Sequence, residues 1–311
     1  MPDLPNQIES PAPSLGKGAR GFALSPGQLL PMLFLAVIWG LSIPLTKLGL
    51  QTLPPLTLTA LRFGVAVPLL LLLTLGQRLP APALPRVAAL GILGISIGQI
   101  AQTFGINGTT ASVGTIISAT IPVFVVVFAA LRLGQSVTLM QKVGLLAAFA
   151  GIAMVAMGQG PEASSLHQTS LAGAAWMLLS ALSIAFYYVW SVELTAEYGT
   201  AAVAAWSTLF GLLVLLPWTA WEAWHTPITL TASGLGVAVY LGLAVTVAGL
   251  FLWLRILRTV PASVAAGVQY LQPVIGMVAS AVMFGDHLGI LFLLGVALIL
   301  AGLGLTVRSP A

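Results

Sequence analysis

The chain has 311 residues, of which 59% are hydrophobic and only 6% are charged, and its mean hydropathy is +1.06. Soluble domains carry roughly 25% charged residues, so this composition excludes a water-soluble globular protein and indicates that lipid surrounds most of the chain. The absence of cysteine excludes disulfides, thiolate metal sites and a cysteine nucleophile. The formal net charge is +4, and the positions of the charges are informative.

The N-terminal segment differs in composition from the rest of the chain. Residues 1–27 are rich in proline, serine and glycine and contain no apolar run of signal-peptide length. We therefore expect residues 1–27 to form a disordered cytoplasmic tail. The first apolar segment is then a retained helix and not a cleaved signal.

Ten apolar segments are long enough to cross a membrane, since a helix needs about 20 apolar residues to span the hydrocarbon layer. Short connections with glycine, proline or charged residues separate them. In chain order, the expected spans are residues 29–50, 55–76, 85–106, 110–131, 137–158, 171–193, 200–221, 233–254, 260–283 and 288–307. The sequence thus predicts an all-α integral membrane protein with ten transmembrane helices.

Lysine and arginine predict the orientation, because the cytoplasmic loops of membrane proteins carry an excess of both. When the N-terminus is placed in the cytoplasm, the outer loops contain neither residue. The inner side then holds Lys17, Arg20, Arg78, Arg86, Arg132, Lys142, Arg255, Arg258 and Arg308. Both termini are therefore expected on the cytoplasmic side.

Two stretches of the chain repeat each other. Residues 111–151 align on residues 262–302 without a gap, at a constant offset of 151. The matched pairs are Ala111/Ala262, Ser112/Ser263, Val113/Val264, Pro122/Pro273, Gly134/Gly285, Gly144/Gly295 and Gly151/Gly302. Chance is the alternative in so apolar a chain, but it rarely preserves proline and glycine in the same register.

A duplication divides the chain into two halves of five helices, residues 28–158 and 171–308, joined by an external linker at 159–170. Because five is odd, the second half would cross the membrane in the opposite direction. Inverted repeats are a device of secondary transporters, whose substrate site lies between the repeats. The expected architecture is two inverted five-helix repeats, and it indicates alternating access.

Three segments carry a family resemblance: "LAVIWGLSIPLTKLGL" at 35–50, "PLTLTALRFGVAV" at 55–67, and "ASVGTIISATIPVFVVVFAALRLG" at 111–134 with its copy. Over about residues 30–307 the chain resembles the EamA-type members of the drug/metabolite transporter superfamily. Within it, the chain is most similar to bacterial amino-acid exporters, including the aromatic amino acid exporter. The resemblance implies an exporter of small metabolites in a bacterial inner membrane. Sister families handle sugars, purines, thiols and drugs, so other solutes stay open.

Arg62 is the most unusual residue within the spans. It lies about eight residues into its span, or about 12 Å deep, where a cation is costly and normally faces a partner or a wet cavity. The corresponding stretch of the second half, 204–216, has no cation. Arg62 can anchor a substrate carboxylate, clamp helix-end carbonyls or snorkel outward. Lys47, near the outer end of the first span, either snorkels to the interface or faces the cavity mouth.

Other polar and aromatic residues within the spans are also substrate-site candidates. Amides in lipid must find partners, either a zwitterionic ligand or one another. A face that mixes aromatic rings with hydroxyls suits an amphipathic solute, although core packing is the alternative for each residue. These candidates are Trp39, Gln99, Gln102, Thr103, Trp176, Ser180, Tyr187, Tyr240 and Gln269.

Three prolines within the spans are candidate hinges. Proline removes one backbone hydrogen bond and can kink its helix. Pro122 and Pro273 are a matched pair of the repeat, and Pro44 lies in the first span. Kinked packing without motion is the alternative.

The acidic residues are expected in the tail, in loops or at span ends: Asp3, Glu9, Glu162, Glu193, Glu197, Glu222 and Asp286. A proton-coupled pump usually carries an intramembrane carboxylate or histidine, and a phosphate-binding glycine loop is also absent. We therefore expect a facilitator or exchanger that needs no ATP, cofactor or metal and binds no nucleic acid, as a monomer or homodimer. A membrane-embedded enzyme would need clustered catalytic groups, and a channel or receptor is a further alternative.

A topology reporter tests the ten-span interpretation. Green fluorescent protein fused after Ala311 should fluoresce, and alkaline phosphatase at the same point should be inactive, because the C-terminus is expected in the cytoplasm. Phosphatase fused within the linker at 159–170 is the matched control and should be active. Phosphatase activity at the C-terminus would contradict an even number of spans.

Overall fold

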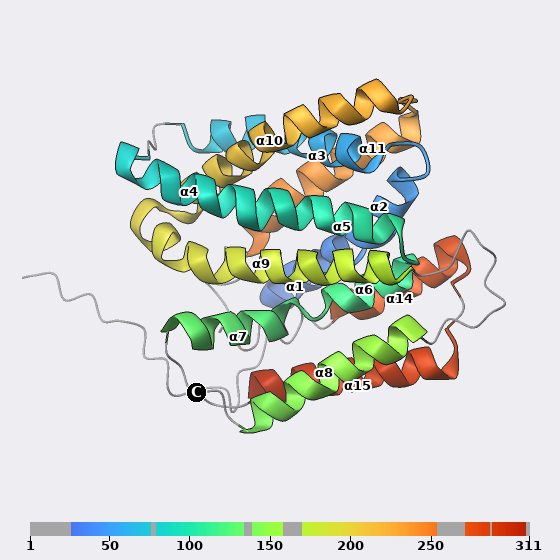
Figure 1. Ribbon diagram of the computed structural model, residues 1–311. Coiled ribbons are helices and arrows are strands. Elements are labelled where there is room, and N and C mark those ends of the chain that lie inside the picture. Colours follow the sequence, from blue (N-terminus) through green and yellow to red (C-terminus); the bar gives the residue numbers. More distant parts are fainter. Residues whose placement is uncertain are drawn as a thin grey trace, which may run out of the picture.

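The computed structural model describes residues 26–75, 79–133, 139–157, 170–253, 271–286 and 288–308 (Figure 1). Within these ranges every regular element is a helix. The elements are α1 (Pro26–Gly40), α2 (Ser42–Gly49), α3 (Pro55–Leu73), η1 (Ala81–Ala83), α4 (Leu84–Leu90), η2 (Gly91–Ser96), α5 (Ile97–Asn107), α6 (Ala111–Ser118), α7 (Ile121–Leu133), α8 (Leu139–Met157), α9 (Leu171–Tyr198), α10 (Thr200–His225), α11 (Ala232–Tyr240), η3 (Leu241–Ala248), α14 (Leu271–Phe284) and α15 (Ile290–Arg308).

Six helical segments of the described chain are long and apolar enough to cross a membrane. They are Leu29–Gly49, Pro55–Leu73, Ala81–Asn107, Leu171–Tyr198, Thr200–His225 and Ala232–Trp253. Shorter apolar helices are Ala111–Val125, Lys142–Val155, Leu271–Phe284 and Ile290–Gly302. The predicted all-helical membrane class is thus confirmed, whereas the count of ten spans and the inverted repeat stay predictions. Residues 1–25, most of the linker and the first part of the ninth expected span lie outside the described residues.

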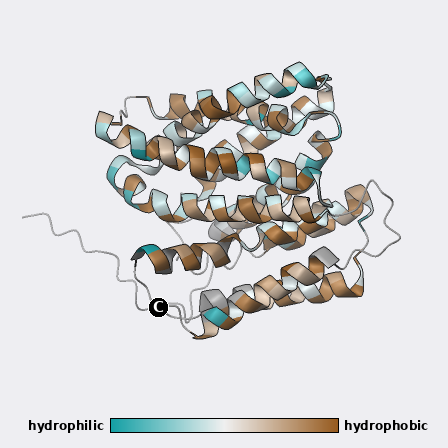
Figure 2. Cartoon of the chain, in the orientation of Figure 1, coloured by the Kyte–Doolittle hydropathy of each residue, from teal (hydrophilic) through white to brown (hydrophobic). Residues whose placement is uncertain are grey.

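The surface of the helix bundle is apolar, as a lipid environment requires. Large hydrophobic side chains stand exposed along the helices, for example Leu146 at 70% and Val282 at 81%. Figure 2 shows hydrophobic residues along most of the helix lengths and several of the hydrophilic ones at helix ends. An apolar surface of this extent on a soluble monomer would promote association, so lipid is its natural solvent.

Two of the expected spans are interrupted at prolines. Between α1 and α2 the helix breaks shortly before Pro44, which is buried and has no N–H to donate to the carbonyl of Gly40. Between α6 and α7 it breaks shortly before Pro122, which cannot donate to Ser118. Pro273 is buried in the first turn of α14. Pro44 and Pro122 therefore lie at real helix breaks, and their role as hinges stays a prediction.

Two π-helical segments, η2 and η3, interrupt the third and eighth expected spans. They occupy matching positions of the repeat, because Gly91 plus the offset of 151 gives Gly242. Both glycines allow a close backbone approach. A Cβ at Gly91 would collide with the carbonyl oxygen of Ser207 on α10, and a Cβ at Gly242 would lie 2.8 Å from the carbonyl oxygen of Arg62 on α3. Each π-segment therefore packs directly on the backbone of a neighbouring span.

Helices α8 and α15 form a closely packed pair at one side of the bundle (Figure 1). A Cβ on Gly151 would lie 2.6 Å from the carbonyl oxygen of Gly295, and one on Gly295 would lie 2.8 Å from that of Gly151. Further along, Gly302 lies against the carbonyl oxygen of Gly144. Small residues of this kind permit helix association in lipid. Gly144/Gly295 and Gly151/Gly302 are matched pairs of the proposed repeat. The contact of Gly151 with Gly295 is therefore repeated by their matched residues, Gly302 and Gly144.

Two acidic side chains cap helix N-termini. The Glu222 carboxylate is buried and accepts hydrogen bonds from the backbone N–H groups of Leu56 and Thr57 at 3.1 and 2.7 Å, at the start of α3. Asp286 accepts from the N–H of Ser112 at 2.9 Å, at the start of α6. A carboxylate is stabilised there by the unpaired N–H groups and the positive end of the helix dipole. Both acids thus stabilise the ends of spans.

Lys47 binds the opposite kind of helix end. Its Nζ donates to the carbonyl oxygens of Ile106, Asn107 and Thr109 at 2.9, 3.2 and 2.7 Å, at the C-terminus of α5. The three N–H groups of the ammonium therefore have three acceptors. This contact is a structural clamp, which differs from both the snorkelling and the cavity-mouth interpretations of the sequence.

The glycine contacts of α8 predict a difference between two equally small substitutions. Gly151→Ala should destabilise the protein by about 1–3 kcal/mol, the usual cost of overpacking, because its Cβ would lie 2.6 Å from the carbonyl oxygen of Gly295. Gly304→Ala, on α15, should be neutral or stabilising by up to about 1 kcal/mol, because nothing lies within 4 Å of its Cβ. Thermal melting in detergent, followed by size-exclusion chromatography, measures both. Equal melting temperatures for the two variants would contradict the packing.

Candidate functional site

Arg62 extends from α3 toward two neighbouring spans. Its Nε donates to Thr246 Oγ1 at 3.0 Å and its Nη1 donates to Gln99 Oε1 at 2.7 Å (on η3 and α5 respectively). Both acceptors are neutral, and within the described part of the chain no carboxylate forms an ion pair with this guanidinium. Arg62 thus joins α3, α5 and η3 while it keeps its full positive charge.

A chain of hydrogen bonds continues from Gln99. The Thr103 hydroxyl lies 2.8 Å from the backbone carbonyl of Gln99 and 2.9 Å from the Thr59 hydroxyl. The Thr59 hydroxyl lies 2.9 Å from the carbonyl of Pro55. Because each hydroxyl has one proton, two of these three contacts are hydrogen bonds at any one time. Gln99 and Thr103 thus both face α3, where they contact Arg62 and Thr59.

The π-helical segment η3 supplies the other acceptor. The Thr246 hydroxyl donates to the carbonyl of Leu241, five residues earlier, at 2.9 Å and accepts from Arg62. The neighbouring carbonyl of Val245 accepts a hydrogen bond of 3.1 Å from Trp39 Nε1. π-helical segments frequently occur at functional sites, because the extra residue frees backbone groups from the regular ladder. In η3 the carbonyl of Val245 binds Trp39 directly beside Thr246, the residue that binds Arg62.

Aromatic side chains surround this point. The Tyr240 hydroxyl donates to the carbonyl of Ile38 at 2.9 Å. Trp39 and Trp253 have ring centroids 6.0 Å apart, with the planes tilted by 48°. Trp39 and Tyr240 are both partly buried and pack on the same apolar cluster. The first and eighth expected spans are therefore joined by the two predicted aromatic candidates.

Tyr188 is close enough to Arg62 to interact with it electrostatically, although it was not a predicted site residue. The side chain of Tyr188 is 49% exposed, and it extends from the middle of α9. Its neighbour Tyr187 shares a hydrogen bond of 3.2 Å with Ser207 and packs on Gly94 of η2. Tyr187 is therefore bound to α10, while the Tyr188 hydroxyl has no hydrogen-bond partner among the described residues.

Arg62 has unused hydrogen-bonding capacity. A guanidinium carries five N–H groups, and only two of these have partners among the described residues. The three remaining N–H groups belong to Nη1 and Nη2, and the side chain is partly exposed. A carboxylate can accept two parallel N–H bonds from such a group. An anionic oxygen group bound at these N–H groups would leave the two existing contacts in place.

Other predicted residues do not join this cluster. Trp176 lies on α9 eleven residues before Tyr187, about 16 Å along the helix, where it is 42% exposed and faces Phe104 at 5.8 Å. Ser180 is fully buried, with no hydrogen-bond partner for its hydroxyl among the described residues. Gln102 is partly buried and makes no side-chain hydrogen bond to the described chain. Gln269 lies outside the described residues.

The packing of α9 explains why its predicted polar face is unavailable. That face packs against glycines of the third expected span. Gly105 contacts Met177, and Gly98 contacts Ser183 and Ile184. Core packing, one of the two interpretations of this face, accounts for Ser180 and Ser183. Among the described residues no group of three histidines, cysteines or acids could hold a metal ion.

Sequence reasoning did not select four residues of the cluster, which are Thr59, Tyr188, Thr246 and Trp253. Thr246 is a single hydroxyl in an apolar span, and its matched position in the first half is Ile95. The sequence feature that could have identified Thr246 is that a polar residue in one half is matched by an apolar residue in the other. Tyr188 resembled the aromatic residues that line membrane interfaces, and only its place on α9 distinguishes it.

Comparisons with known proteins agree with a transport role. The model of the EamA-like transporter family matches residues 27–157 and 171–308. An uncharacterized transporter of Archaeoglobus fulgidus is 25% identical over 87% of this chain and 95% of its own length. A probable terminal-alkyne amino-acid exporter of Streptantibioticus cattleyicolor is 30% identical over 88% of this chain and 90% of its own length. The uncharacterized inner membrane transporter YedA of Escherichia coli is 28% identical over 84% of each chain.

A solved crystal structure supports the same fold. It superposes with a TM-score of 0.62, covers 90% of this chain and 96% of its own, and is 18% identical in sequence. The family and these relatives are transporters and not enzymes. The family model matches both helical halves of the chain, which therefore belongs to the EamA-like transporter family.

Proposed function

We propose that the chain exports small organic metabolites, most of all amino acids including aromatic ones, by alternating access without ATP. The observation that carries this proposal is the incomplete coordination of Arg62. Two of its N–H groups bind neutral oxygens, and the others have no partner in the described chain. A cation within a membrane span normally faces a partner or a wet cavity, and a substrate carboxylate would supply the partner.

The comparison between the two cations within the spans separates a binding role from a structural one. Lys47 has three donors and three carbonyl acceptors, so its coordination is complete. Arg62 has five donors, and the described residues offer two acceptors to them. If Arg62 were a clamp of the same kind, we would expect further carbonyls around it. The contrast favours a ligand at Arg62.

Three observations support amino acids as the substrate class. An anionic group fits Arg62, and the aromatic rings of Trp39, Tyr188 and Tyr240 offer apolar faces to a side chain. A relative that is 30% identical is named a probable terminal-alkyne amino-acid exporter. Purines, sugars and drug-like cations are the competing solutes, and a cation would be repelled by the free charge of Arg62.

Alternating access rests on the duplication of the chain. The two separate matches of the family model have nearly the boundaries of the proposed halves, 28–158 and 171–308. The π-segments occur at matched positions, and the matched glycines of α8 and α15 contact one another reciprocally. These features support two similar halves that can exchange conformations around a central site. Two halves of five helices, joined by an external linker, would place both termini of the chain in the cytoplasm and the whole chain in a bacterial inner membrane.

The energy source follows from the position of the acids. In the described chain Glu193, Glu197, Glu222 and Asp286 lie at helix ends. A fixed proton site in the middle of the membrane would need a carboxylate or histidine at that depth. We therefore propose a facilitator or exchanger that moves its substrate down a gradient.

Counterflow in proteoliposomes tests the proposed function. Vesicles loaded with unlabelled tryptophan should accumulate labelled tryptophan from outside without an ion gradient. Loads of threonine, lysine, taurine and a purine then define the breadth of substrates. A failure of every amino acid, with protein that elutes as a folded species, would contradict the proposed substrate class.

Substitution of Arg62 tests the proposed anchor. Arg62→Ala should reduce tryptophan counterflow by at least about tenfold, since a hydrogen bond to a charged group is worth about 1.5–3 kcal/mol. The wild type should discriminate between tryptophan and tryptamine, which lacks the carboxylate, and the variant should lose this discrimination. Lys142→Gln, an exposed charge on α8, is the control and should transport normally. Unchanged discrimination in Arg62→Ala would show that Arg62 does not bind the carboxylate.

A further inference from the structure

A second candidate binding site lies away from Arg62, at the end of the bundle where α4 begins and where α7 and α9 end. A cavity of about 270 Å³ lies between these three helices. Its walls include Arg86 of α4, Arg132 of α7, and Phe186 and Trp190 of α9. In Figure 1 the N-terminal end of α4 and the C-terminal ends of α7 and α9 lie together at the left of the bundle. The proposed substrate site makes no use of these residues.

One carboxylate oxygen holds both guanidinium groups at this cavity. Glu193 Oε2 lies 2.7 Å from Arg132 Nη2 and 3.5 Å from Arg86 Nη2. The cluster therefore keeps a net charge of +1, and most N–H groups of the two arginines have no partner among the described residues. The Arg86 side chain is 55% exposed and that of Arg132 is 29% exposed. A single acid thus aligns two cations without neutralising both.

Aromatic rings fix the wall of the cavity. Trp190 stacks on Phe186 with centroids 4.5 Å apart and meets Phe128 edge-on at 5.6 Å. The guanidinium of Arg132 lies over the Trp190 ring, 5.2 Å from its centroid, which is a cation–π geometry. Trp190 therefore holds Arg132 in place beside an apolar wall. A tryptophan and an arginine in this arrangement are typical of the level of lipid headgroups.

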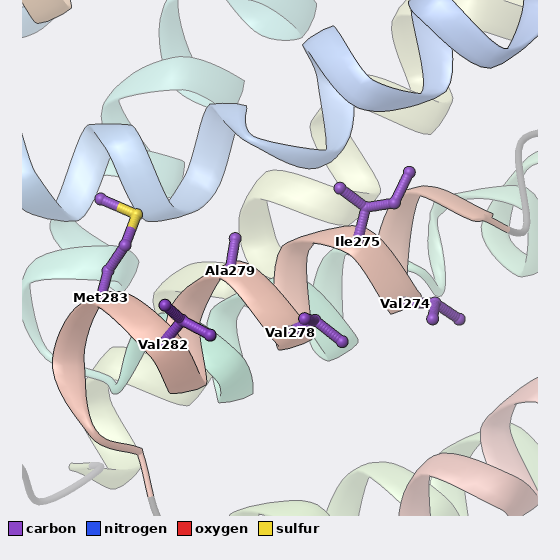
Figure 3. Close-up of a pocket in the computed structure, with 6 residues that line it drawn as sticks. All are labelled: Val274, Ile275, Val278, Ala279, Val282 and Met283. Carbon is purple, nitrogen blue, oxygen red and sulfur yellow. The ribbon is translucent and has the colours of Figure 1, made fainter.

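Comparison with α14, the helix of the other half that matches α7, shows which residues distinguish this cavity. α14 borders an apolar groove of about 470 Å³, lined by its own Val274, Ile275, Val278, Ala279, Val282 and Met283 (Figure 3). At the offset of 151, Met283 corresponds to Arg132, and Ala279 corresponds to Phe128. Both matched helices thus border a hollow on the side of the bundle, but only the one at α7 carries arginine and aromatic residues. A lipid chain alone would not require this difference.

We propose that the cavity at Arg86, Arg132 and Trp190 binds the phosphate group of an anionic phospholipid. Two guanidinium groups match the oxygens of a phosphodiester. The net charge of +1 favours a lipid with net negative charge, and basic cavities between transmembrane helices are known to hold such headgroups. The apolar residues of the cavity and the adjoining helix surfaces would contact the glycerol and the acyl chains. This site is independent of the proposed substrate site.

Native mass spectrometry of the full chain in detergent tests the proposal with phosphatidylglycerol and phosphatidylcholine as probes. The wild type should retain phosphatidylglycerol in preference to phosphatidylcholine. Arg86→Gln and Arg132→Gln should each weaken the retention about fivefold, the effect of one basic residue near an anionic lipid. Lys142→Gln and Met283→Gln are the matched controls, one for charge and one for the apolar groove, and both should retain the lipid.

The remaining arms separate the possible outcomes. Equal loss in Lys142→Gln would show attraction by overall charge and would overturn the proposal. Displacement of the lipid by millimolar glycerol 3-phosphate would identify a free phosphate ester as the ligand and would overturn the lipid assignment. Arg132→Lys keeps the charge but loses the planar guanidinium, so it should retain the lipid better than Arg132→Gln and less well than the wild type. Size-exclusion profiles identify any variant that has not folded.

Discussion

In a bilayer, a polar group that has lost its water must find its partner within the protein, and this constraint organises the described part of the chain. Glu222, Asp286 and Lys47 meet it at helix ends, where backbone N–H and carbonyl groups are free. Thr246 and Trp39 meet it at η3, where the π-helical turn frees carbonyls inside a span. Arg62 is the exception among these groups, because most of its N–H groups have no acceptor among the described residues.

Because Arg62 contacts two neighbouring spans, a ligand bound to it would act on those spans as well. Arg62 bonds to α5 and to η3 at once, and the backbone of Arg62 also lies against Gly242 of η3. A ligand that pulls on the guanidinium therefore acts on three spans through short, rigid links. Packed interfaces of this kind change between discrete arrangements and do not deform continuously. Substrate binding at Arg62 would thus bias the relative placement of the two proposed halves.

Several elements were predictable from sequence because they depend on local pattern. The apolar segments gave the helices, and the spacing of four residues between Gln99 and Thr103 gave their common face. Prolines 44 and 122 marked the helix breaks because the missing N–H acts within four residues. The isolated charge of Arg62 marked the site, since charge within an apolar span is costly wherever it packs.

Other features depend on contacts between distant segments, which a pattern along the chain does not contain. Glu222 was assigned to a span end, but α10 continues to His225 and brings the carboxylate onto α3, more than 160 residues away in sequence. Lys47 finds its carbonyls about 60 residues away. The π-turn that presents Thr246 has the same hydrophobic pattern as an α-helix, so no periodicity distinguishes the two.

The two proposed halves share their glycines at backbone contacts but differ in their charged residues. Glycines that allow backbone contact persist in pairs, as Gly91/Gly242 and Gly151/Gly302 show, because a Cβ at most of these positions would collide with a neighbouring carbonyl. Charges have not persisted, since Met283 is the counterpart of Arg132 and no cation follows the pattern of Arg62. The two halves can therefore share the glycines that their helix packing requires and still differ in the charged side chains that could bind a ligand. In the proposed mechanism the backbone contacts would constrain how the halves move, and single side chains in one half would decide what is bound.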